Sequence, residues 1–310
     1  MGRYYKDYAD FLREVFPGNK MQKLTVNAGF SCPNRDGTLG SGGCAYCNNA
    51  SFSPMLGGGE IATQIENGKR FFSGKYPEMR YIAYFQSYTN THAGTGRLLD
   101  LYHEALAVDK VDGLIIGTRP DCVSDKLLHA LADIGKPVIM EYGAESSHNA
   151  TLAAVNRCHT WEQTVDAVQR TAGAGLRAGL HFIMGLPGET ESAMMQTVER
   201  LGRLPVDTVK FHQLQIIKGT TMAQECEGDW ESGSLKFRGL SIKSFSVDEY
   251  VDLCVRVVER LRCINPDIAI ERFTSQAPAD LLLSPRWGLK NYQFVNLLNN
   301  RLSRGRINGM

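Results

Sequence analysis

The sequence predicts an α/β fold built on a parallel sheet. From residue 22 to about 217, short apolar runs rich in β-branched and aromatic residues alternate with longer segments of helical periodicity. Strands separated by helices of this length pair in parallel. Six such units are too few for an eight-stranded barrel, so the pattern favours an open, partial barrel or a doubly wound sheet.

Each expected element can be placed on the chain. The predicted strands are 23–28, 81–86, 113–118, 137–143, 177–186 and 208–217. The predicted helices between them are 60–72, 95–108, 124–134, 161–173 and 190–203. Ser124 is expected to cap the third of these helices and Gly135 to end it, because these residue types favour the two ends of a helix.

The pattern changes after about residue 218, which predicts three segments. These are an N-terminal segment (1–21), a core (22–218) and a C-terminal extension packed on the core (219–310). The extension contains a helical run at 246–264 and a short strand candidate at 267–273. Its tail is basic, with Arg286, Lys290, Arg301, Arg304 and Arg306.

Composition narrows the class of protein. The chain has 310 residues, 43% of them hydrophobic and 22% charged, with a net charge of +1. This is enough apolar material for a sizeable core. The charged N-terminus is not a secretory signal, and the longest apolar run, at 178–187, is too short to span a bilayer. We therefore expect a cytoplasmic protein without a membrane partner, in which thiols stay reduced.

Three of the eight cysteines stand on a glycine-rich loop after the first predicted strand. Cys32, Cys44 and Cys47 have the spacing C-x11-C-x2-C. Three thiols in a reduced protein indicate metal binding. Zinc needs a fourth ligand, such as His92, His159 or Cys158. An iron–sulfur cluster on three thiolates leaves one iron open to a small molecule, and the residues alone leave both alternatives open.

The other five cysteines have a simpler interpretation. Cys122, Cys254 and Cys263 stand in apolar patterns and are expected to be small buried hydrophobic residues. The same interpretation is favoured for Cys158 and Cys226.

Polar residues gather where the predicted strands end. They are Gln86, Ser87, Tyr88 and Thr89 after the second strand, Thr118 and Arg119 after the third, and Glu141 and Glu145 around the end of the fourth. In parallel α/β folds, ligands bind at the carboxyl ends of the strands. The sequence therefore predicts its site at this edge.

Ordered blocks of sequence carry a family resemblance. "FSCPNRDGTLGSGGCAYCN", "AYFQSYTNT", "GTRPDC", "LAAVNR", "GLPGE" and "IIKGT" occur in this order between residues 30 and 220. Together they resemble the YhcC-like family of the radical S-adenosylmethionine (SAM) superfamily. The resemblance implies a partial (β/α)6 TIM-like barrel with a C-terminal α/β extension. It also implies a [4Fe–4S] cluster on Cys32, Cys44 and Cys47, with SAM on the fourth iron.

The same resemblance implies an enzyme and a set of SAM contacts. The enzyme reductively cleaves SAM to a 5′-deoxyadenosyl radical, which abstracts a hydrogen atom from a substrate. An electron donor such as flavodoxin or ferredoxin is the implied partner. The implied SAM contacts are Tyr46, Gln86, Ser87, Glu141, Glu145, Arg157 and His181. As alternatives, Arg157 could be a surface ion-pair partner, His181 a core histidine and Glu141 a helix cap.

These motifs do not name the substrate. Candidate substrate contacts at the remaining strand ends are Tyr88, His92, Arg119, His212 and Lys218, with Asn90, Asp121, Gln213 and Arg272 beside them. The cysteine loop is similar to that of the Elongator catalytic subunit, which implies tRNA, at a wobble uridine, as the leading substrate. The basic tail would then contact phosphates. The alternatives are a small-molecule or peptide substrate, and a zinc-stabilised RNA-binding protein without catalysis.

Overall fold

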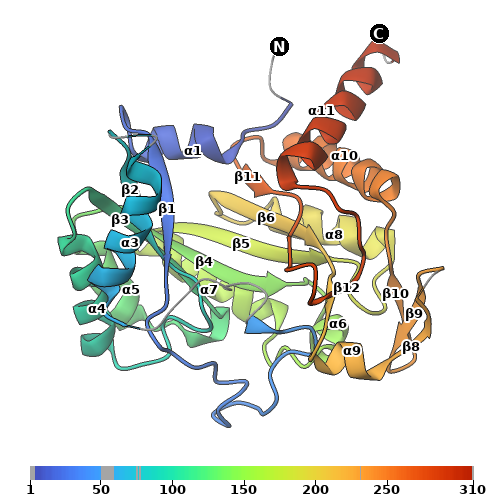
Figure 1. Cartoon of the computed structure of the whole chain (residues 1–310), viewed down its shortest axis with the longest axis horizontal. Coiled ribbons are helices and arrows are strands. Elements are labelled where there is room, and N and C mark those ends of the chain that lie inside the picture. Colours follow the sequence, from blue (N-terminus) through green and yellow to red (C-terminus); the bar gives the residue numbers. More distant parts are fainter. Residues whose placement is uncertain (1–3, 50–58, 75, 77, 231, 309–310) are drawn as a thin grey trace.

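A curled parallel sheet forms the centre of the molecule (Figure 1). The computed structural model describes residues 4–49, 59–74, 76, 78–230 and 232–308. The sheet has seven strands in the order β1-β2-β3-β4-β5-β6-β11, all paired in parallel. The strands are β1 (Met21–Val26), β2 (Arg80–Phe85), β3 (Val111–Thr118), β4 (Val138–Glu145), β5 (Arg177–Met184), β6 (Thr208–Gln213) and β11 (Ala269–Arg272). This confirms the expected partial barrel.

Helices cover the outer face of the sheet (Figure 1). They are α3 (Ile61–Ser73), α4 (Thr95–Ala107), α5 (Asp125–Ala132), α7 (Trp161–Gly173) and α8 (Glu191–Leu201). Each packs an apolar side on the strands, as α4 does with Leu98 and Tyr102. Ser124 caps α5 as expected, because its side chain accepts a hydrogen bond from the Leu127 N–H.

One end of the barrel is closed by an apolar plug. Helix α1 (Tyr8–Val15) lies across this end of the sheet (Figure 1). Phe11 and Phe16 are buried in one cluster with inward-facing Ile82, Ile115 and Ile139. The Ile270 N–H donates to the Lys6 carbonyl at 2.9 Å, so the segment just before α1 is attached to β11, an edge strand of the sheet.

Above the plug, four charged side chains meet inside the barrel. The Lys23 Nζ lies 2.6 Å from a Glu271 carboxylate oxygen, and the Lys210 Nζ lies 2.6 Å from a Glu141 oxygen. Two longer contacts cross-link the pairs, Lys23 to Glu141 at 3.4 Å and Lys210 to Glu271 at 3.2 Å. We call these four residues the charge cluster. Because β1 and β11 are the two edge strands, the Lys23–Glu271 pair joins the open edges of the half-barrel.

Burial and charge have opposite effects within the charge cluster. Burial would raise the pKa of Glu141, but Lys210 and Lys23 outweigh it and hold the pKa well below its usual range. The pKa of Glu271 is lowered for the same reason. Both carboxylates are therefore ionised at neutral pH, and two positive charges neutralise two negative ones.

The structure corrects several details of the sequence prediction. The expected strand 208–217 is broken: it forms β6 and a separate β7 (Ile216–Ile217), which pairs with β12 (Leu282–Ser284). The strand candidate at 267–273 is not peripheral, because it supplies β11 to the central sheet. The short helix α6 (Asn149–Ala154) after β4 was not expected.

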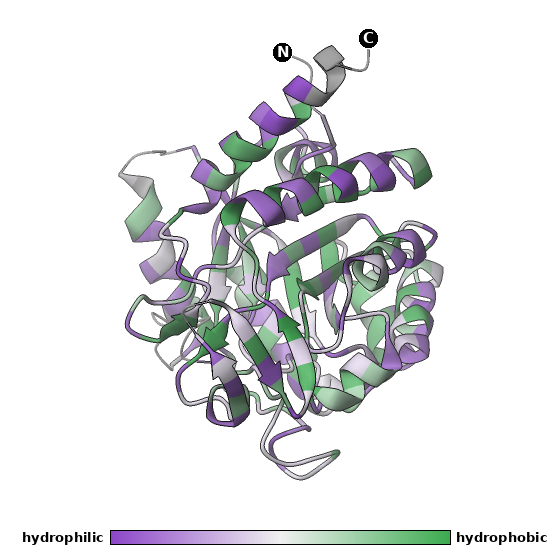
Figure 2. Cartoon of the chain, turned by 90° about the vertical axis from the view of Figure 1, so that its right-hand side faces the viewer, coloured by the Kyte–Doolittle hydropathy of each residue, from purple (hydrophilic) through white to green (hydrophobic). Residues whose placement is uncertain are grey.

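The C-terminal region adds a small sheet and two long helices. The strands β8 (Cys226–Asp229), β9 (Ser234–Phe237) and β10 (Leu240–Lys243) form an antiparallel sheet after α9 (Thr221–Glu225). Helices α10 (Val247–Ile264) and α11 (Asn291–Asn308) pack together, and hydrophobic and polar residues alternate along α10 (Figure 2).

The cysteines outside the loop do not all behave as expected. Cys254 is buried inside α10, in agreement with the sequence prediction. Cys263, near the end of the same helix, and Cys158 are exposed, so the expectation of burial is wrong for both, and Cys122 and Cys226 are half-buried.

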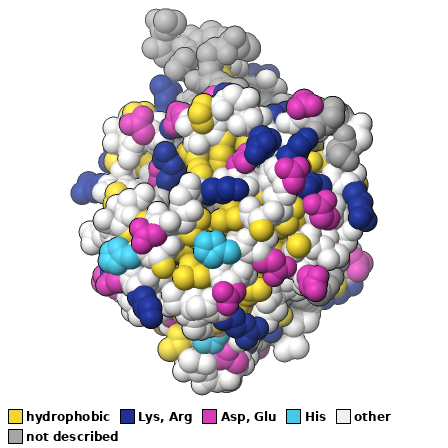
Figure 3. Space-filling model, turned by 90° about the vertical axis from the view of Figure 1, so that its left-hand side faces the viewer, with side chains coloured by type: hydrophobic (Ala, Val, Ile, Leu, Met, Phe, Trp, Pro, Cys, Tyr) yellow, Lys and Arg dark blue, Asp and Glu magenta, His cyan; other side chains and the backbone are white. Residues whose placement is uncertain are grey.

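The face in Figure 3 carries basic and acidic side chains that are interspersed, without a continuous patch of one sign. Within the described residues, no helix is long and apolar enough to cross a membrane.

Breaking the charge cluster should cost more stability than breaking a surface pair. The Lys23→Met variant leaves two buried carboxylates with Lys210 as their remaining lysine. We expect it to lower the free energy of unfolding by roughly 3 kcal/mol. Urea unfolding of the protein measures the change.

Lys243→Met is the matched control, because it removes the exposed Lys243–Glu249 pair (2.7 Å) and should cost less than about 1 kcal/mol. The double variant Lys23→Met/Glu271→Leu should recover most of the loss, since Lys210 and Glu141 remain paired. Equal effects for Lys23→Met and Lys243→Met would contradict the role of the charge cluster.

Candidate active site

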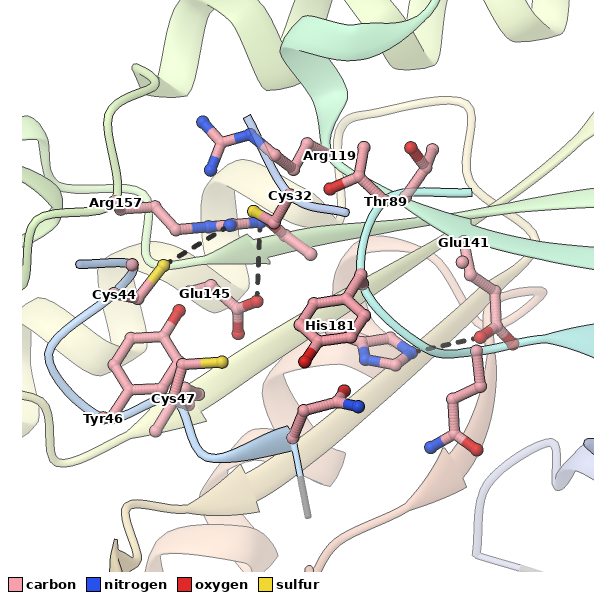
Figure 4. A pocket seen from close by; sticks show the side chains of 18 of the residues that line it. Cys32, Cys44, Tyr46, Cys47, Thr89, Arg119, Glu141, Glu145, Arg157 and His181 are labelled. Atoms are coloured by element: carbon pink, nitrogen blue, oxygen red, sulfur yellow. Dashed lines mark hydrogen bonds and ion pairs between the residues drawn. The ribbon is translucent and has the colours of Figure 1, made fainter. Parts of the chain in front are cut away.

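A cavity opens at the carboxyl ends of the central strands, above the charge cluster (Figure 4). The cysteine loop forms one wall and the ends of β2 to β6 and β11 form the others. The polar and sulfur-bearing side chains that line it are Cys32, Arg35, Cys44, Tyr46, Cys47, Asn49, Tyr84, Gln86, Tyr88, Thr89, Thr118, Arg119, Glu141, Glu145, Arg157, His181, His212 and Arg272. This is the edge at which the sequence predicts a site.

The cysteine loop is held in place by Asn34. This side chain is fully buried, and its Nδ2 donates to the Asn156 carbonyl at 2.5 Å. The same nitrogen lies 3.6 Å from the Cys44 Sγ, and the Cys158 thiol donates to the Asn34 Oδ1 at 3.0 Å. A Cβ on Gly40 would lie 2.5 Å from this Oδ1, so the loop needs glycine there to enclose the amide.

The three loop thiols differ in their surroundings. Cys44 is buried, whereas Cys32 and Cys47 are half-buried, and all three line the cavity (Figure 4). Burial and the neighbouring Cys44 raise the pKa of Cys47 to about 11. A metal that binds this thiol must therefore displace its proton.

Three arginines around the cavity keep unused hydrogen-bonding capacity. Arg157 donates to the Gly143 carbonyl at 2.5 Å and from Nη1 to the Cys44 Sγ at 3.7 Å, but its Nε is buried without a partner. Arg119 forms two bonds to Asp121, at 2.9 and 2.8 Å, and its third nitrogen is buried without a partner. The Nε of Arg272 is likewise buried without a hydrogen-bond partner. A cavity with such donors suits an anionic ligand.

Glu145 faces Arg157 from the end of β4, with their charged atoms 3.7 Å apart (Figure 4). Burial raises the pKa of Glu145, an effect that Arg157 and Arg119 partly offset. Gly143 permits this approach, because a Cβ there would lie 2.5 Å from the Glu145 Oε1 and 2.8 Å from the Arg157 Nη2.

Backbone strain is concentrated around the cavity. Six described residues other than glycine have a left-handed φ, and four of them belong to this region: Tyr88 (62°), Glu145 (66°), Asn156 (55°) and Cys158 (59°). Such conformations cost about 1–3 kcal/mol each and persist when the surrounding structure holds them. The strained positions therefore gather around the cysteine loop and the cavity beside it.

The two histidines of the cavity are neutral at pH 7. Burial, together with the Lys210 charge, lowers the pKa of His181 to about 4, and burial with the Arg272 charge lowers that of His212 to about 3. The His181 Nε2 lies 3.2 Å from the ionised Glu141, so this nitrogen donates and Nδ1 remains an acceptor.

Most of the residues predicted from the sequence lie together. The cavity is lined by the three cysteines, by six of the seven predicted SAM contacts (Tyr46, Gln86, Glu141, Glu145, Arg157 and His181), and by Tyr88, Arg119 and His212 of the predicted substrate contacts.

Three predicted residues do not line the cavity. Ser87 is buried behind it. His92 bonds to Asp36 at 2.9 Å and lines a separate pocket behind the cysteine loop. Lys218 is exposed, and its carbonyl accepts a bond from the Asn48 amide at 2.9 Å. Each of the three lies near a strand end in the sequence, but the turn at that end carries its side chain away.

Three of the further candidates have structural partners. Asn90 donates to the carbonyls of Phe85 and Gly117 and so joins the ends of β2 and β3. Asp121 fixes Arg119, and Gln213 bonds to Ser275. Asn34 and Arg35 were missed by the sequence analysis, because a polar residue in a glycine-rich turn gives no local sign that it is buried or faces a ligand.

The alternative of a single zinc ion finds no support in the geometry. Within the described residues, no three His, Cys, Asp or Glu side chains are grouped closely enough to hold one metal ion. Of the fourth ligands considered, His92 bonds to Asp36, Cys158 to Asn34, and His159 to the Gly143 carbonyl at 3.2 Å.

Comparison with protein families gives two adjacent matches. The Radical SAM superfamily model matches residues 32–201, and the Radical_SAM C-terminal domain model matches residues 206–304. Protein YtqA of Bacillus subtilis is 35% identical over 303 residues, which cover 96% of this chain and 89% of YtqA. Protein YhcC of Escherichia coli is 37% identical over 274 residues, covering 87% and 83% of the two chains.

More distant likenesses extend the comparison. The tRNA uridine(34) acetyltransferase of Methanocaldococcus infernus is 29% identical over 126 residues, which are 40% of this chain and 23% of that enzyme. Among solved structures, an N-terminally truncated Elp3 of Methanocaldococcus infernus superposes with a TM-score of 0.62 over 93% of this chain and 63% of Elp3. At 16% identity, this second likeness is one of fold.

Proposed function

This chain belongs to the radical SAM superfamily and is a radical SAM enzyme, and we propose that its cysteine loop holds the cluster that the family uses. The family uses a [4Fe–4S] cluster together with SAM. In our proposal, Cys32, Cys44 and Cys47 each bind one iron as thiolates, and SAM occupies the fourth. With the cluster and SAM bound, the site would supply one-electron reductive cleavage of SAM to methionine and a 5′-deoxyadenosyl radical for hydrogen abstraction from the substrate, and an external donor such as flavodoxin or ferredoxin would provide the electron.

The observation that carries this proposal is the meeting of three thiols and three incompletely bonded guanidinium groups at one cavity. Three thiols that line one cavity suit a cluster, in which each thiolate binds a different iron. Arg157, whose Nη1 lies 3.7 Å from the Cys44 Sγ, offsets the negative charge that thiolates bring. The residues present therefore fit the group.

Within this proposal, the SAM contacts divide by chemistry. Arg157 offers its buried Nε to the SAM carboxylate, because a guanidinium fork matches that group. Gln86 takes the amino group, Tyr46 flanks the adenine, and Glu145 with neutral His181 faces the ribose. Glu141 acts through His181, since its own carboxylate is bonded to Lys210 and Lys23.

We further propose that the substrate is a tRNA, modified at a wobble uridine. The similarity to a tRNA uridine(34) acetyltransferase supports this substrate class. Tyr88, which is 38% exposed, and the exposed Arg35 stand at the cavity and can stack on an unstacked base and meet its phosphate. The basic tail supports the substrate less than expected, because Arg301 is already paired with Asp248 and Asp252.

The cluster ligands can be assigned by iron and sulfide analysis. Wild-type protein purified without oxygen should contain about four irons and four sulfides and form 5′-deoxyadenosine from SAM under reducing conditions. Cys32→Ala, Cys44→Ala and Cys47→Ala should each lose most of the cluster and all of the product. Cys263→Ala is the control, since this thiol is exposed on α10. About one zinc and no sulfide in the wild type would reject the assignment.

Arg157→Lys tests the carboxylate contact. Lysine keeps the positive charge but loses the fork, so we expect the Kd for SAM to rise roughly tenfold while the iron content stays normal. Arg177→Lys is the control, because Arg177 forms an exposed pair with Asp207. Equilibrium binding to the reconstituted protein measures the Kd. An unchanged value would remove Arg157 from the SAM site.

The tRNA substrate can be tested in cells. Nucleoside analysis of total tRNA from a deletion strain should show the loss of one modified uridine, which the wild-type gene restores and the Cys44→Ala gene does not. Identical nucleosides in the deletion strain and its parent would point to a small-molecule or peptide substrate instead.

A further inference from the structure

We propose that a second pocket, which we call the amide pocket, binds one nucleotide of an RNA substrate outside the catalytic cavity. The polar and aromatic residues that line it include Gln213, Gln215, Ser275, Arg286, Trp287 and Lys290. The inference rests on the proposed tRNA substrate and names a site for a nucleotide next to the one that enters the cavity.

The amide pocket adjoins the cavity along two strands. His212 lines the cavity, and the next residue of β6, Gln213, lines the amide pocket. On β11, Arg272 lines the cavity, and Thr274 just beyond it lines the amide pocket. The ends of these two strands therefore separate the two spaces, and a strand of RNA with one base in the cavity passes the amide pocket.

Gln215 offers an unused acceptor inside the amide pocket. The side chain is 8% exposed, and its Nε2 donates to the Ser275 carbonyl at 3.0 Å. This bond fixes the orientation of the amide, and the Oε1 is buried without a hydrogen-bond partner. A buried acceptor without a hydrogen-bond partner favours a ligand that brings an N–H donor, such as the edge of a base.

The neighbouring Gln213 is fully engaged. Its Oε1 accepts from the Ser275 N–H at 3.3 Å, and its Nε2 lies 3.4 Å from the Ser275 carbonyl. Both glutamines thus bond to the backbone of Ser275, which holds this part of the wall of the amide pocket in place. Gln215 is the residue with an atom left for a ligand.

The charge of the amide pocket is positive. Arg286 and Lys290 are exposed at its rim, and neither forms an ion pair with a described residue. The Arg286 Nε donates to the Leu282 carbonyl at 3.2 Å, which leaves the end of the guanidinium to solvent. Within the described part of the chain, no Asp or Glu lines the amide pocket. These cations suit a phosphate.

Trp287 supplies an aromatic wall. Its indole N–H donates to the Phe245 carbonyl at 2.9 Å, and its ring is nearly parallel to that of Phe294, with the centroids 6.1 Å apart. These contacts hold the ring in one orientation. Aromatic side chains stack on unpaired bases, so Trp287 and the Gln215 acceptor together match the base of a nucleotide. The two cations at the rim match its phosphate.

Binding of tRNA to pocket variants tests the inference. The probe is unfractionated tRNA from a deletion strain, titrated with cluster-loaded protein at several salt concentrations. Arg286→Ala/Lys290→Ala should raise the Kd at least tenfold and flatten the slope of log Kd against log salt by about 1.4, which corresponds to two single-strand phosphate contacts. Gln215→Ala should raise the Kd about fivefold and leave the slope unchanged.

The matched control is Arg238→Ala/Lys243→Ala. It also removes two exposed cations from the C-terminal region, where they pair with Glu225 and Glu249, and should leave the Kd nearly unchanged. Urea unfolding confirms that each variant is folded. If the wild type binds tRNA and the pocket variants match the control, the amide pocket is overturned and the tRNA substrate stands. If the wild type binds no tRNA at low salt, both proposals fail.

Discussion

The fold depends on four charges buried inside an incomplete barrel. Lys23 and Glu271 come from the two edge strands, so their contact joins edges that no backbone hydrogen bonds connect. A β-bulge between Ile270 and Arg272 allows this, because it lets successive residues of β11 both reach the interior: Glu271 meets the lysines and Arg272 lines the cavity. Gly179 leaves room beside Glu141, since a Cβ there would lie 2.5 Å from the Thr208 Oγ1 and 3.5 Å from the Glu141 Cγ.

The charge cluster also separates the two ends of the barrel. Below it, Phe11, Phe16 and the inward isoleucines form an apolar plug. Above it, the cavity opens toward the cysteine loop. Glu141 takes part in both the charge cluster and the cavity, because it binds Lys210 and also accepts a hydrogen bond from His181, which fixes the tautomer of that histidine. A rigid layer of this kind can support strained residues such as Glu145 and Asn156 at the cavity, where a flexible scaffold would relax them.

The C-terminal region takes part in the site as well as packing on the core. It supplies Arg272 to the cavity through β11 and the whole outer wall of the amide pocket through residues 274–290. In our proposals, the reaction in the cavity and the recognition of a neighbouring nucleotide in the amide pocket therefore take place in adjacent spaces at the ends of β6 and β11. The C-terminal domain model matches residues 206–304, a range that begins just before β6 and includes β11.

The features that depend on local chemistry could be predicted from the amino-acid sequence. Short stretches of sequence indicate the alternation of strands and helices, the Ser124 cap and the C-x11-C-x2-C loop. Most of the predicted site residues line the cavity because the carboxyl ends of parallel strands converge. The remaining features depend on contacts between residues far apart in the chain. Lys23 and Glu271 are 248 residues apart, and Asn34 meets Cys158 across 124 residues, so no local pattern marks either pair. The prediction also failed for three residues that stand in turns just after strand ends, Ser87, His92 and Lys218. The conformation of a turn, and not the strand before it, sets the direction of such a side chain, so these three do not line the cavity.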